Sequence, residues 1–317
     1  MIELVNVTKH YPGADRAAVQ DFSITIPAGE VVVLIGPSGC GKSTTLRMIN
    51  ALVVPDSGRV LLDGVDVLTV PPQELRRGIG YAIQGVGLFP HWTVHENIGT
   101  VPWLKGWDAE RVTARVRELL ELVGLDPDRY ASEYPDELSG GEAQRVGVAR
   151  ALAADPPVLL MDEPFGAVDP LTRDRLQREF MTIQARLKKT VVFVTHDIDE
   201  AVRIGDRIAI MRDGRLVQYD LPERVLAYPA DDFVADFVGG ERALKRLSLA
   251  RLQGVMQPAE GPANDVPAVG QDATLREALS RILESGEDVI AVVDEAGVVV
   301  GRVSIEDLLG HFKRPVP

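Results

Sequence analysis

The stretch GPSGCGKST, residues 36–44, constrains the fold of this chain more than any other feature. It follows the continuous apolar run VVVLIG (31–36) and precedes a helical pattern, so it fits G-x-x-x-x-G-K-[ST] in a strand–loop–helix context. Glycines let backbone N–H groups turn inward around phosphate oxygens, and a helix N-terminus adds the positive end of its dipole. The alternative is a glycine-rich turn with a chance lysine. The predicted phosphate loop comprises Gly36, Pro37, Ser38, Gly39, Cys40, Gly41, Lys42, Ser43 and Thr44.

Two further apolar runs, PVLLMD (157–162) and VVFVTH (191–196), are also continuous rather than alternating. Such runs are typical of strands buried on both faces of a parallel sheet. Helical patterns lie between the runs, at 108–123, 142–153 and 171–188. The order predicts an α/β domain with a mostly parallel sheet. Near the N-terminus, IELVNV and FSITIP alternate, which predicts half-buried antiparallel strands beside that sheet.

Charge and composition exclude several classes of protein. The net charge of −13 argues against nucleic acid as a partner, because binding to a phosphate backbone needs a basic face. A single cysteine, Cys40, excludes a disulfide framework and predicts a cytosolic setting. The N-terminal sequence shows no signal peptide, and no stretch reaches about 18 consecutive apolar residues. We therefore expect any membrane role to come through a partner.

Two carboxylates, Asp162 and Glu163, end the second apolar run in LLMDEP (159–164). With a phosphate loop present, Lys42 is expected to reach the β- and γ-phosphates. The Ser43 hydroxyl and Asp162 are then expected to hold Mg²⁺, and Glu163 to orient or deprotonate the attacking water. His196, at the end of the third run, would contact the γ-phosphate at the same sheet edge. The alternatives are two acids capping a surface turn and a structural histidine.

Six stretches, in chain order, together resemble the ATP-binding subunit of an ABC transporter. They are GPSGCGKST, Gln84, LSGGEAQR (138–145), VLLMDEP, GAVDP and VTHD. The resemblance runs from about residue 2 to residue 240 and implies an ABC-type P-loop NTPase domain at 1–240 that binds ATP and Mg²⁺. It also implies an antiparallel β subdomain and a helical subdomain at about 88–150. In this family Tyr11 would stack on adenine, and Gln84 would contact Mg²⁺ and the attacking water.

The family resemblance implies that LSGGEAQR, which we call the signature motif, acts in trans. It would close over the γ-phosphate held by the second chain of a head-to-tail homodimer, and Asp169 would cross the same interface. Physically, a helix N-terminus is an anion-binding end. The residues expected to act in trans are Ser139, Gly140, Gly141, Glu142 and Asp169. Glu142 departs from the usual Gln; a carboxylate there suits the helix dipole, but close to a triphosphate it would weaken dimer closure.

Three shorter stretches resemble the branch that imports osmoprotectants such as glycine betaine, choline and carnitine. They are IQGVGLFPH (83–91), PWLKGW (102–107) and ERALKRLSL (241–249). The resemblance implies membrane-spanning permease subunits and a substrate-binding protein as partners, and a location at the cytoplasmic face of a bacterial inner or plasma membrane. The apolar loop 85–98 is expected to dock the permease, with core packing as the alternative. An importer for another small solute, and a soluble ABC ATPase acting on ribosomes or DNA, are alternative functions.

Composition changes after residue 240. A basic connecting helix is predicted at 241–254, and QPAEGPANDVP (257–267) predicts a linker or long loop. Beyond it come a helix, two strands joined by a turn at 295–297, and a closing helix. Residues 255–317 resemble a single CBS motif, in which Ser304 and Asp307 would contact a ribose; an ordinary helix N-cap is the alternative. A complete module has two motifs, so the tail would either pair across the dimer or be vestigial. With the basic helix, it predicts a sensor of a regulatory nucleotide or of ionic strength.

Overall fold

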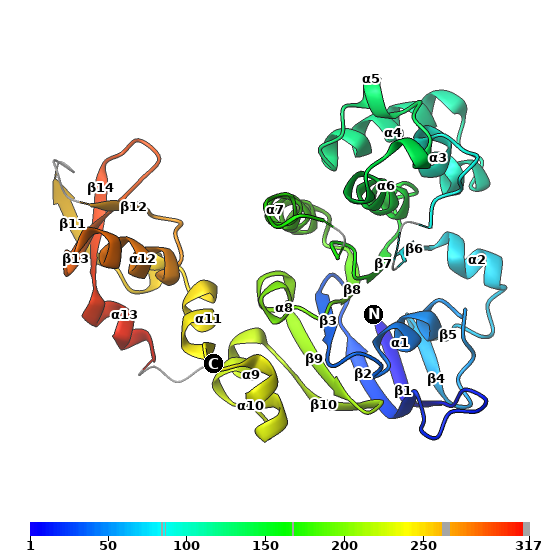
Figure 1. The fold of residues 1–317 in the computed structure, drawn as a ribbon, viewed down its shortest axis with the longest axis horizontal. Coiled ribbons are helices and arrows are strands. Elements are labelled where there is room, and N and C mark those ends of the chain that lie inside the picture. The colour runs from blue at the N-terminus through cyan, green and yellow to red at the C-terminus, as the bar shows by residue number, and fades with distance from the viewer. Residues whose placement is uncertain (84, 86, 167, 262–266, 313–317) are drawn as a thin grey trace. The chain divides into compact units, whose positions relative to one another are not determined.

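The computed structural model describes every residue except 84, 86, 167, 262–266 and 313–317. Contacts divide the chain into two compact units, Met1–Tyr219 and Asp220–Pro317 (Figure 1). Each unit has its own hydrophobic core and is described by itself. The domain limits predicted at 240 and 254 stay predictions.

A six-stranded sheet forms the centre of the first unit, in the order β10-β9-β3-β8-β7-β6. Its middle strands β3 (Val31–Ile35), β8 (Thr190–Val194) and β7 (Val158–Asp162) are parallel and buried at every position. This confirms the three apolar runs as buried parallel strands. The remaining strands are β6 (Ile79–Ala82), β9 (Arg207–Arg212) and β10 (Arg215–Asp220).

A separate antiparallel sheet, in the order β2-β1-β4-β5, lies in the same unit. The predicted pair is β1 (Ile2–Lys9) and β2 (Val19–Ile26), and buried positions alternate along β2. The other two strands are β4 (Ser57–Leu62) and β5 (Val65–Asp66). One hydrophobic cluster joins both sheets with the helix α1 (Lys42–Ile49), which enters it through Leu46, Met48 and Ile49. The helix that follows the phosphate loop is therefore fixed by the core.

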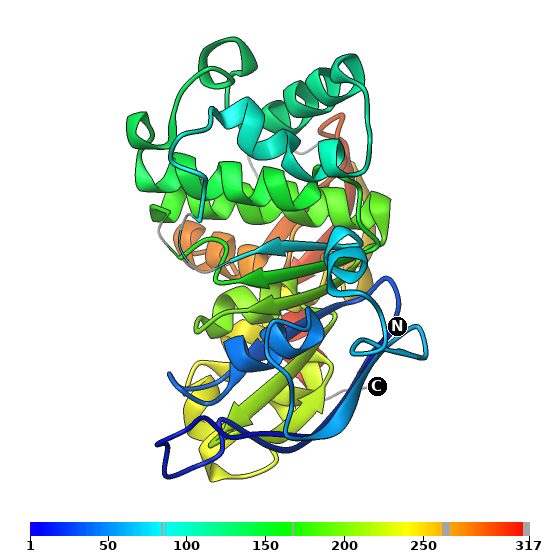
Figure 2. The same ribbon diagram turned by 90° about the vertical axis from the view of Figure 1, so that its right-hand side faces the viewer.

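Helices gather at one end of the first unit, away from the antiparallel sheet (Figures 1 and 2). They are α3 (Val94–Leu104), α4 (Ala109–Leu122), α5 (Pro127–Tyr130) and α6 (Gly140–Leu152). The predicted helical patterns correspond to α4, α6 and α7 (Pro170–Leu187). The short helices α2 (Pro72–Arg77) and α8 (Ile198–Ile204) complete the unit.

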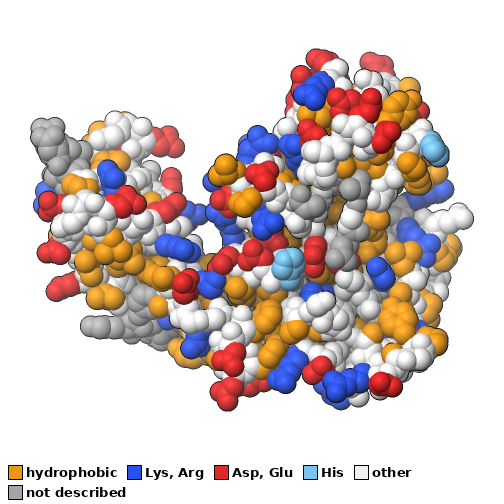
Figure 3. Space-filling model, in the orientation of Figure 1, with side chains coloured by type: hydrophobic (Ala, Val, Ile, Leu, Met, Phe, Trp, Pro, Cys, Tyr) orange, Lys and Arg blue, Asp and Glu red, His pale blue; other side chains and the backbone are white. Residues whose placement is uncertain are grey.

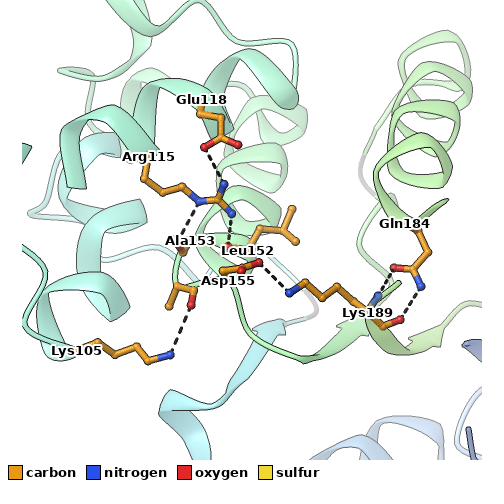
Figure 4. A network of polar contacts seen from close by, with 9 residues as sticks. Lys105, Arg115, Glu118, Leu152, Ala153, Asp155, Gln184 and Lys189 are labelled. Carbon is orange, nitrogen blue, oxygen red and sulfur yellow. Dashed lines mark hydrogen bonds and ion pairs between the residues drawn. The ribbon is translucent and has the colours of Figure 1, made fainter. Parts of the chain in front are cut away.

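Polar contacts fix the C-terminal end of α6 (Figure 4). The last carbonyl groups of a helix have no partner within it. Here the Arg115 guanidinium of α4 donates to the carbonyl oxygens of Leu152 (3.0 Å) and Ala153 (3.3 Å). Just beyond the helix, Lys189 forms an ion pair of 2.8 Å with Asp155. The helix that begins with the signature motif is thus anchored at its far end to both α4 and the start of β8.

The second unit contains helices and a four-stranded sheet in the order β11-β14-β13-β12. Its helices are α9 (Pro222–Ala227), α10 (Asp232–Val238), α11 (Arg242–Leu249), α12 (Leu275–Ser285) and α13 (Ile305–Phe312). Its strands are β11 (Gln257–Gly261), β12 (Ala268–Gly270), β13 (Val289–Val293) and β14 (Val299–Ser304). The order helix, antiparallel strand pair, helix after residue 274 is as predicted.

The prediction of a linker at 257–267 is wrong for its first part, residues 257–261. Residues 257–261 form β11, which pairs with β14 through Gln257 opposite Arg302 and Pro258 opposite Gly301. Proline and glycine suggested a loop, but β11 is an edge strand, and an edge strand tolerates a residue without an N–H donor. The stretch 262–266 lies outside the described residues.

The basic helix α11 presents less positive charge than its sequence indicates. Lys245 is only 9% exposed, and Arg246 forms an ion pair of 3.5 Å with Glu223. In contrast, Leu283 of α12 and Leu309 of α13 are well exposed, and Figure 3 shows hydrophobic side chains gathered on the surface of this unit. Among the helices of the described part of the chain, none combines the length and hydrophobicity needed to cross a membrane.

Candidate functional site

The phosphate loop lies between β3, which ends at Ile35, and α1, which begins at Lys42. Gly41 has a φ of +104°, and a Cβ at this position would collide with the carbonyl oxygen of Ala18. Only glycine satisfies both constraints, so the loop conformation is fixed by its sequence. Pro37, Ser38 and Gly39 are exposed at the tip of the loop.

Lys42 is folded back onto its own loop. Its Nζ donates to the carbonyl oxygens of Gly36 (2.7 Å) and Pro37 (3.0 Å), and lies 3.6 Å from the Cys40 Sγ. The Cys40 side chain is buried, and burial raises the pKa of its thiol, which fits a small filler of the loop. A phosphate that enters the loop would take over the ammonium group of Lys42 from these carbonyls.

Ser43 and Asp162 meet at the carboxyl ends of β3 and β7. The Ser43 hydroxyl donates to Asp162 Oδ1 at 3.0 Å, while Asp162 Oδ2 is buried without a hydrogen-bond partner. Burial raises the pKa of Asp162, and the neighbouring Glu163 raises it further. A hydroxyl and a carboxylate with an unpaired oxygen are hard ligands that Mg²⁺ uses together with phosphate and water. The residues therefore fit this ion.

Glu163 and His196 also lie at this edge. The His196 Nδ1 is 3.3 Å from the Glu163 Oε1, and the two side chains are 68% and 23% exposed. The strands β7 and β8, which they follow, are neighbours in the sheet, as the sequence predicted. A carboxylate next to an imidazole, both open to solvent and close to Asp162, can act on a water molecule at the phosphate loop.

The signature motif opens α6, as predicted. Ser139 is the N-cap, and its hydroxyl accepts from the backbone N–H of Glu142 at 3.3 Å, while the Ser139 N–H donates to Glu142 Oε2 at 2.8 Å. The Tyr130 hydroxyl donates to the other carboxylate oxygen at 2.6 Å. These bonds lower the pKa of Glu142 to about 2, with Tyr130 as the main cause and Ser139 next. The carboxylate that departs from the family pattern is thus bound within its own chain, while Ser139 and Gly140 are exposed.

Replacing Tyr130 with Phe is expected to lower the free energy of unfolding by about 1 kcal/mol at pH 7, the value of one hydrogen bond. Because the folded-state pKa of Glu142 is depressed from 4.5 to about 2, this contribution is present above pH 4.5 and is lost as the pH falls toward 2. Urea unfolding between pH 3 and pH 7 measures it. Tyr134→Phe, at an exposed tyrosine, is the control. A loss that is the same at every pH would contradict the assigned bond.

The other predicted residues of the ATP site are placed as follows. Tyr11 follows β1 and is 38% exposed, and its predicted stacking on adenine stays a prediction. Thr44 lies in the first turn of α1. Asp169 is the N-cap of α7 and accepts from the Thr172 N–H at 3.1 Å, which lowers the pKa of its carboxyl group. Gln84 lies outside the described residues, so its predicted contacts with Mg²⁺ and water stay predictions.

The tail residues Ser304 and Asp307 form a helix N-cap, which is the alternative reading of their spacing. The Ser304 hydroxyl donates to Asp307 Oδ2 at 2.7 Å, and the Asp307 N–H donates back to that hydroxyl at 3.2 Å. The Gln257 amide donates to the second carboxylate oxygen of Asp307 at 3.2 Å. A ribose at this position would have to displace these bonds.

Two residues of the site were not predicted. Tyr130 holds Glu142, and the buried Gln144 donates from its Nε2 to the Glu163 carbonyl oxygen at 2.8 Å. Gln144 is part of the signature motif, but neither spacing nor hydrophobic pattern indicates that its amide meets a residue at the end of β7. Such tertiary contacts leave no periodic signal in the sequence.

A phosphate loop, an adjacent Ser–Asp pair and a nearby Glu–His pair at one sheet edge define a nucleoside triphosphatase. Residues 19–166 match the ABC transporter family, and residues 256–314 match the CBS domain. Among solved structures, the dimeric form of a bacterial ABC transporter cassette has a TM-score of 0.66 and 37% identity, over 70% of this chain and 99% of that chain. The same cassette in a post-hydrolysis state with ADP and Pi also gives 0.66, at 36% identity.

Curated relatives extend the match over nearly the whole chain. The glycine betaine/carnitine/choline transport ATP-binding protein OpuCA of Bacillus subtilis is 48% identical over 96% of this chain and 79% of its own length. The osmoprotectant import ATP-binding protein OsmV of Salmonella typhimurium has the same identity and coverage. The glycine betaine uptake system ATP-binding protein YehX of Escherichia coli is 47% identical over 98% of this chain and 99% of its own length. The chain belongs to the ATP-binding proteins of ABC transporters, a family of transport-coupled ATPases.

Proposed function

We propose that this chain is the ATP-hydrolysing subunit of an importer for osmoprotectants, quaternary amines such as glycine betaine, choline and carnitine. The observation that carries the proposal is the meeting of Ser43, Asp162, Glu163 and His196 at one sheet edge. It occurs in a chain that is 47–48% identical to relatives named for this transport.

Each side chain of the site has a task that follows from its position. Lys42 leaves the carbonyl oxygens of its own loop and binds the β- and γ-phosphates of ATP. Ser43 and Asp162 hold Mg²⁺, which when bound neutralises charge on the phosphate oxygens. Glu163 orients the attacking water and accepts its proton, while His196 holds the Glu163 carboxylate and contacts the γ-phosphate. Tyr11 stacks on the adenine ring.

The functional form in this proposal is a head-to-tail homodimer. Ser139 and the N–H groups of Gly140 and Gly141 lie at the exposed start of α6, where an anion of the partner chain can bind. The Glu142 carboxylate keeps its negative charge at neutral pH, but it is bound by the Tyr130 hydroxyl and the Ser139 N–H of its own chain. We therefore expect it to weaken dimer closure less than an unbound carboxylate at the same position would. The solved cassette that resembles this chain is dimeric.

The proposed permease contact is the loop before α3. Phe89 and Trp92 are 46% and 38% exposed and lie ring to ring at 4.7 Å. The fully buried Asn97 binds the backbone of this loop through Phe89 N–H (2.8 Å) and the carbonyl oxygens of Phe89, Trp92 and Thr93. Beside it lies a groove of about 320 Å³ lined by Arg76, Phe89 and Arg150, among others. A preformed loop with exposed aromatic rings beside a groove suits a protein partner at the cytoplasmic face of the membrane.

Pairing of two tails, nucleotide binding by the tail and a response to ionic strength all stay predictions. Exposed leucines on α12 and α13 are what pairing of two tails would cover. A nucleotide at Ser304 and Asp307 would compete with the N-cap bonds. A response to ionic strength through α11 would rest on few charges, since Lys245 is buried and Arg246 is paired.

Reconstitution with the permease and substrate-binding protein tests the proposed function. Vesicles should take up radiolabelled glycine betaine, choline or carnitine when ATP is supplied on the side of this chain, and Glu163→Gln subunits should abolish the uptake. Uptake of an amino acid alone would favour an importer for another small solute. Co-sedimentation with ribosomes, without co-purification of a membrane protein, would contradict the proposal.

A further inference from the structure

The backbone of Glu163 has an unusual conformation. Its φ is +50°, in the left-handed region that non-glycine residues rarely adopt. Its N–H donates to the carbonyl oxygen of Val194 at 3.0 Å, and its own carbonyl oxygen accepts from the N–H of Gly166 at 3.1 Å. Strained backbone of this kind persists only where surrounding contacts hold it, and it gathers at functional sites.

One side chain also holds this peptide group. Gln144 is 7% exposed, and its Nε2 donates to the Glu163 carbonyl oxygen at 2.8 Å. The direction of the Glu163 side chain depends on its φ, because rotation about N–Cα moves the Cβ. In the observed conformation the carboxylate lies 3.3 Å from His196. Relaxation of φ to a negative value would move the carboxylate relative to the imidazole.

We infer that Gln144 is a positioning residue for hydrolysis: its amide holds the Glu163 carbonyl and thereby fixes the left-handed conformation that directs the Glu163 carboxylate toward His196. The inference rests on the proposed role of Glu163 as the base.

The position of Gln144 on α6 gives this contact a second consequence. Ser139, at the N-cap of α6, faces the ATP of the partner chain in the proposed dimer. Gln144 lies in the second turn of the same helix and contacts the base of its own chain. Because a helix moves as a rigid element, a shift of α6 on dimer closure would reach the Glu163 carbonyl directly. In the proposed dimer, each signature motif therefore contacts the ATP of the partner chain through Ser139 and the base of its own chain through Gln144.

Gln144→Met tests the inference, because methionine keeps the length and apolar contacts but cannot donate. We expect kcat for ATP to fall about tenfold, the effect of one ordinary hydrogen bond, with KM changed less than about twofold. The matched control is Gln184→Met. Gln184 is also buried, and its Nε2 donates to the carbonyl oxygens of Gly29 and Lys189 beside the amino ends of β3 and β8 (Figure 4). Equal kcat in the two variants would overturn the inference.

A second variant keeps the test decisive if methionine impairs folding. Glutamate at position 144 has the shape of glutamine, cannot donate while ionised, and regains a donor when protonated. The kcat of Gln144→Glu, divided by that of the wild type at each pH, should therefore rise as the pH is lowered from 8 to 6. A ratio that is independent of pH would contradict a role through the hydrogen bond.

The Glu163→Gln background separates the two claims. If Gln144 acts by positioning Glu163, adding Gln144→Met to Glu163→Gln should not lower residual single-turnover hydrolysis further. A further tenfold loss would show that Gln144 acts elsewhere and would overturn the inference. Wild-type hydrolysis by Glu163→Gln itself would instead refute the proposed base, whatever the result for Gln144.

Discussion

Glu163→Gln is expected to hydrolyse ATP about 10²–10⁴ times more slowly than the wild type, the usual contribution of a general base. The amide keeps the size of the side chain and its position 3.3 Å from His196, but it cannot accept the proton of the attacking water. Lys42, Ser43 and Asp162 are unchanged, so the affinity for Mg-ATP should be retained. Single-turnover hydrolysis and equilibrium nucleotide binding measure the two quantities separately.

Glu118→Gln serves as the control for this prediction. Glu118 is an exposed carboxylate of α4 that pairs with Arg115 at 2.8 Å, far from the phosphate loop in the sequence and on another element. Its replacement should leave kcat within about twofold of the wild-type value, since exposed ion pairs contribute little. If Glu163→Gln retains the wild-type rate, another group activates the water.

Lys42→Met should lower the affinity for ATP by about 10- to 100-fold, the value of one or two charge-assisted hydrogen bonds. The Lys42 ammonium group is the only cation that the phosphate-loop sequence 36–44 supplies. Because its Nζ also binds the Gly36 and Pro37 carbonyl oxygens, the variant should lose some stability as well. Isothermal titration with Mg-ATP and thermal unfolding distinguish the two effects.

Lys189→Met is the matched control for the lysine. Lys189 forms a half-buried ion pair with Asp155 next to the amino end of β8 (Figure 4). Because β3 and β8 are parallel, this end lies opposite the edge of the sheet that carries the phosphate loop. Its loss should reduce stability but leave ATP affinity unchanged. An equal loss of ATP affinity in both variants would mean that the effect of Lys42→Met is a loss of fold rather than of a phosphate contact.

The sequence predicted the central sheet and the phosphate site because burial and local geometry both leave local signals. Three continuous apolar runs correspond to β3, β7 and β8, and the polar residues that end them meet at one edge. Parallel strands place their carboxyl ends together, so Ser43, Asp162 and His196 were expected at one edge if the three strands lay side by side, as β3, β8 and β7 do. The resemblance to a family supplied the trans role of Ser139, which no local pattern indicates.

What the sequence did not predict depends on partners distant along the chain. Composition at 257–261 indicated a loop, but the backbone groups of β14 make it an edge strand. Glu142 suggested an acid beside a triphosphate, whereas Tyr130, twelve residues earlier, holds its carboxylate. The hydrogen bond from Gln144 to the Glu163 carbonyl oxygen joins α6 to the end of β7. Neither the residue types nor their spacing in the sequence predicts it.

Sedimentation of the Glu163→Gln chain with and without ATP tests the shared active site most directly. The account predicts a monomer without nucleotide and a dimer with ATP. Adding Ser139→Asp should keep the chain monomeric although each copy still binds ATP, because aspartate preserves the N-cap but repels the partner's phosphate. Ser139→Asn, which caps the helix without charge, should still dimerise. An ATP-dependent dimer that forms equally well with aspartate at position 139 would contradict the account.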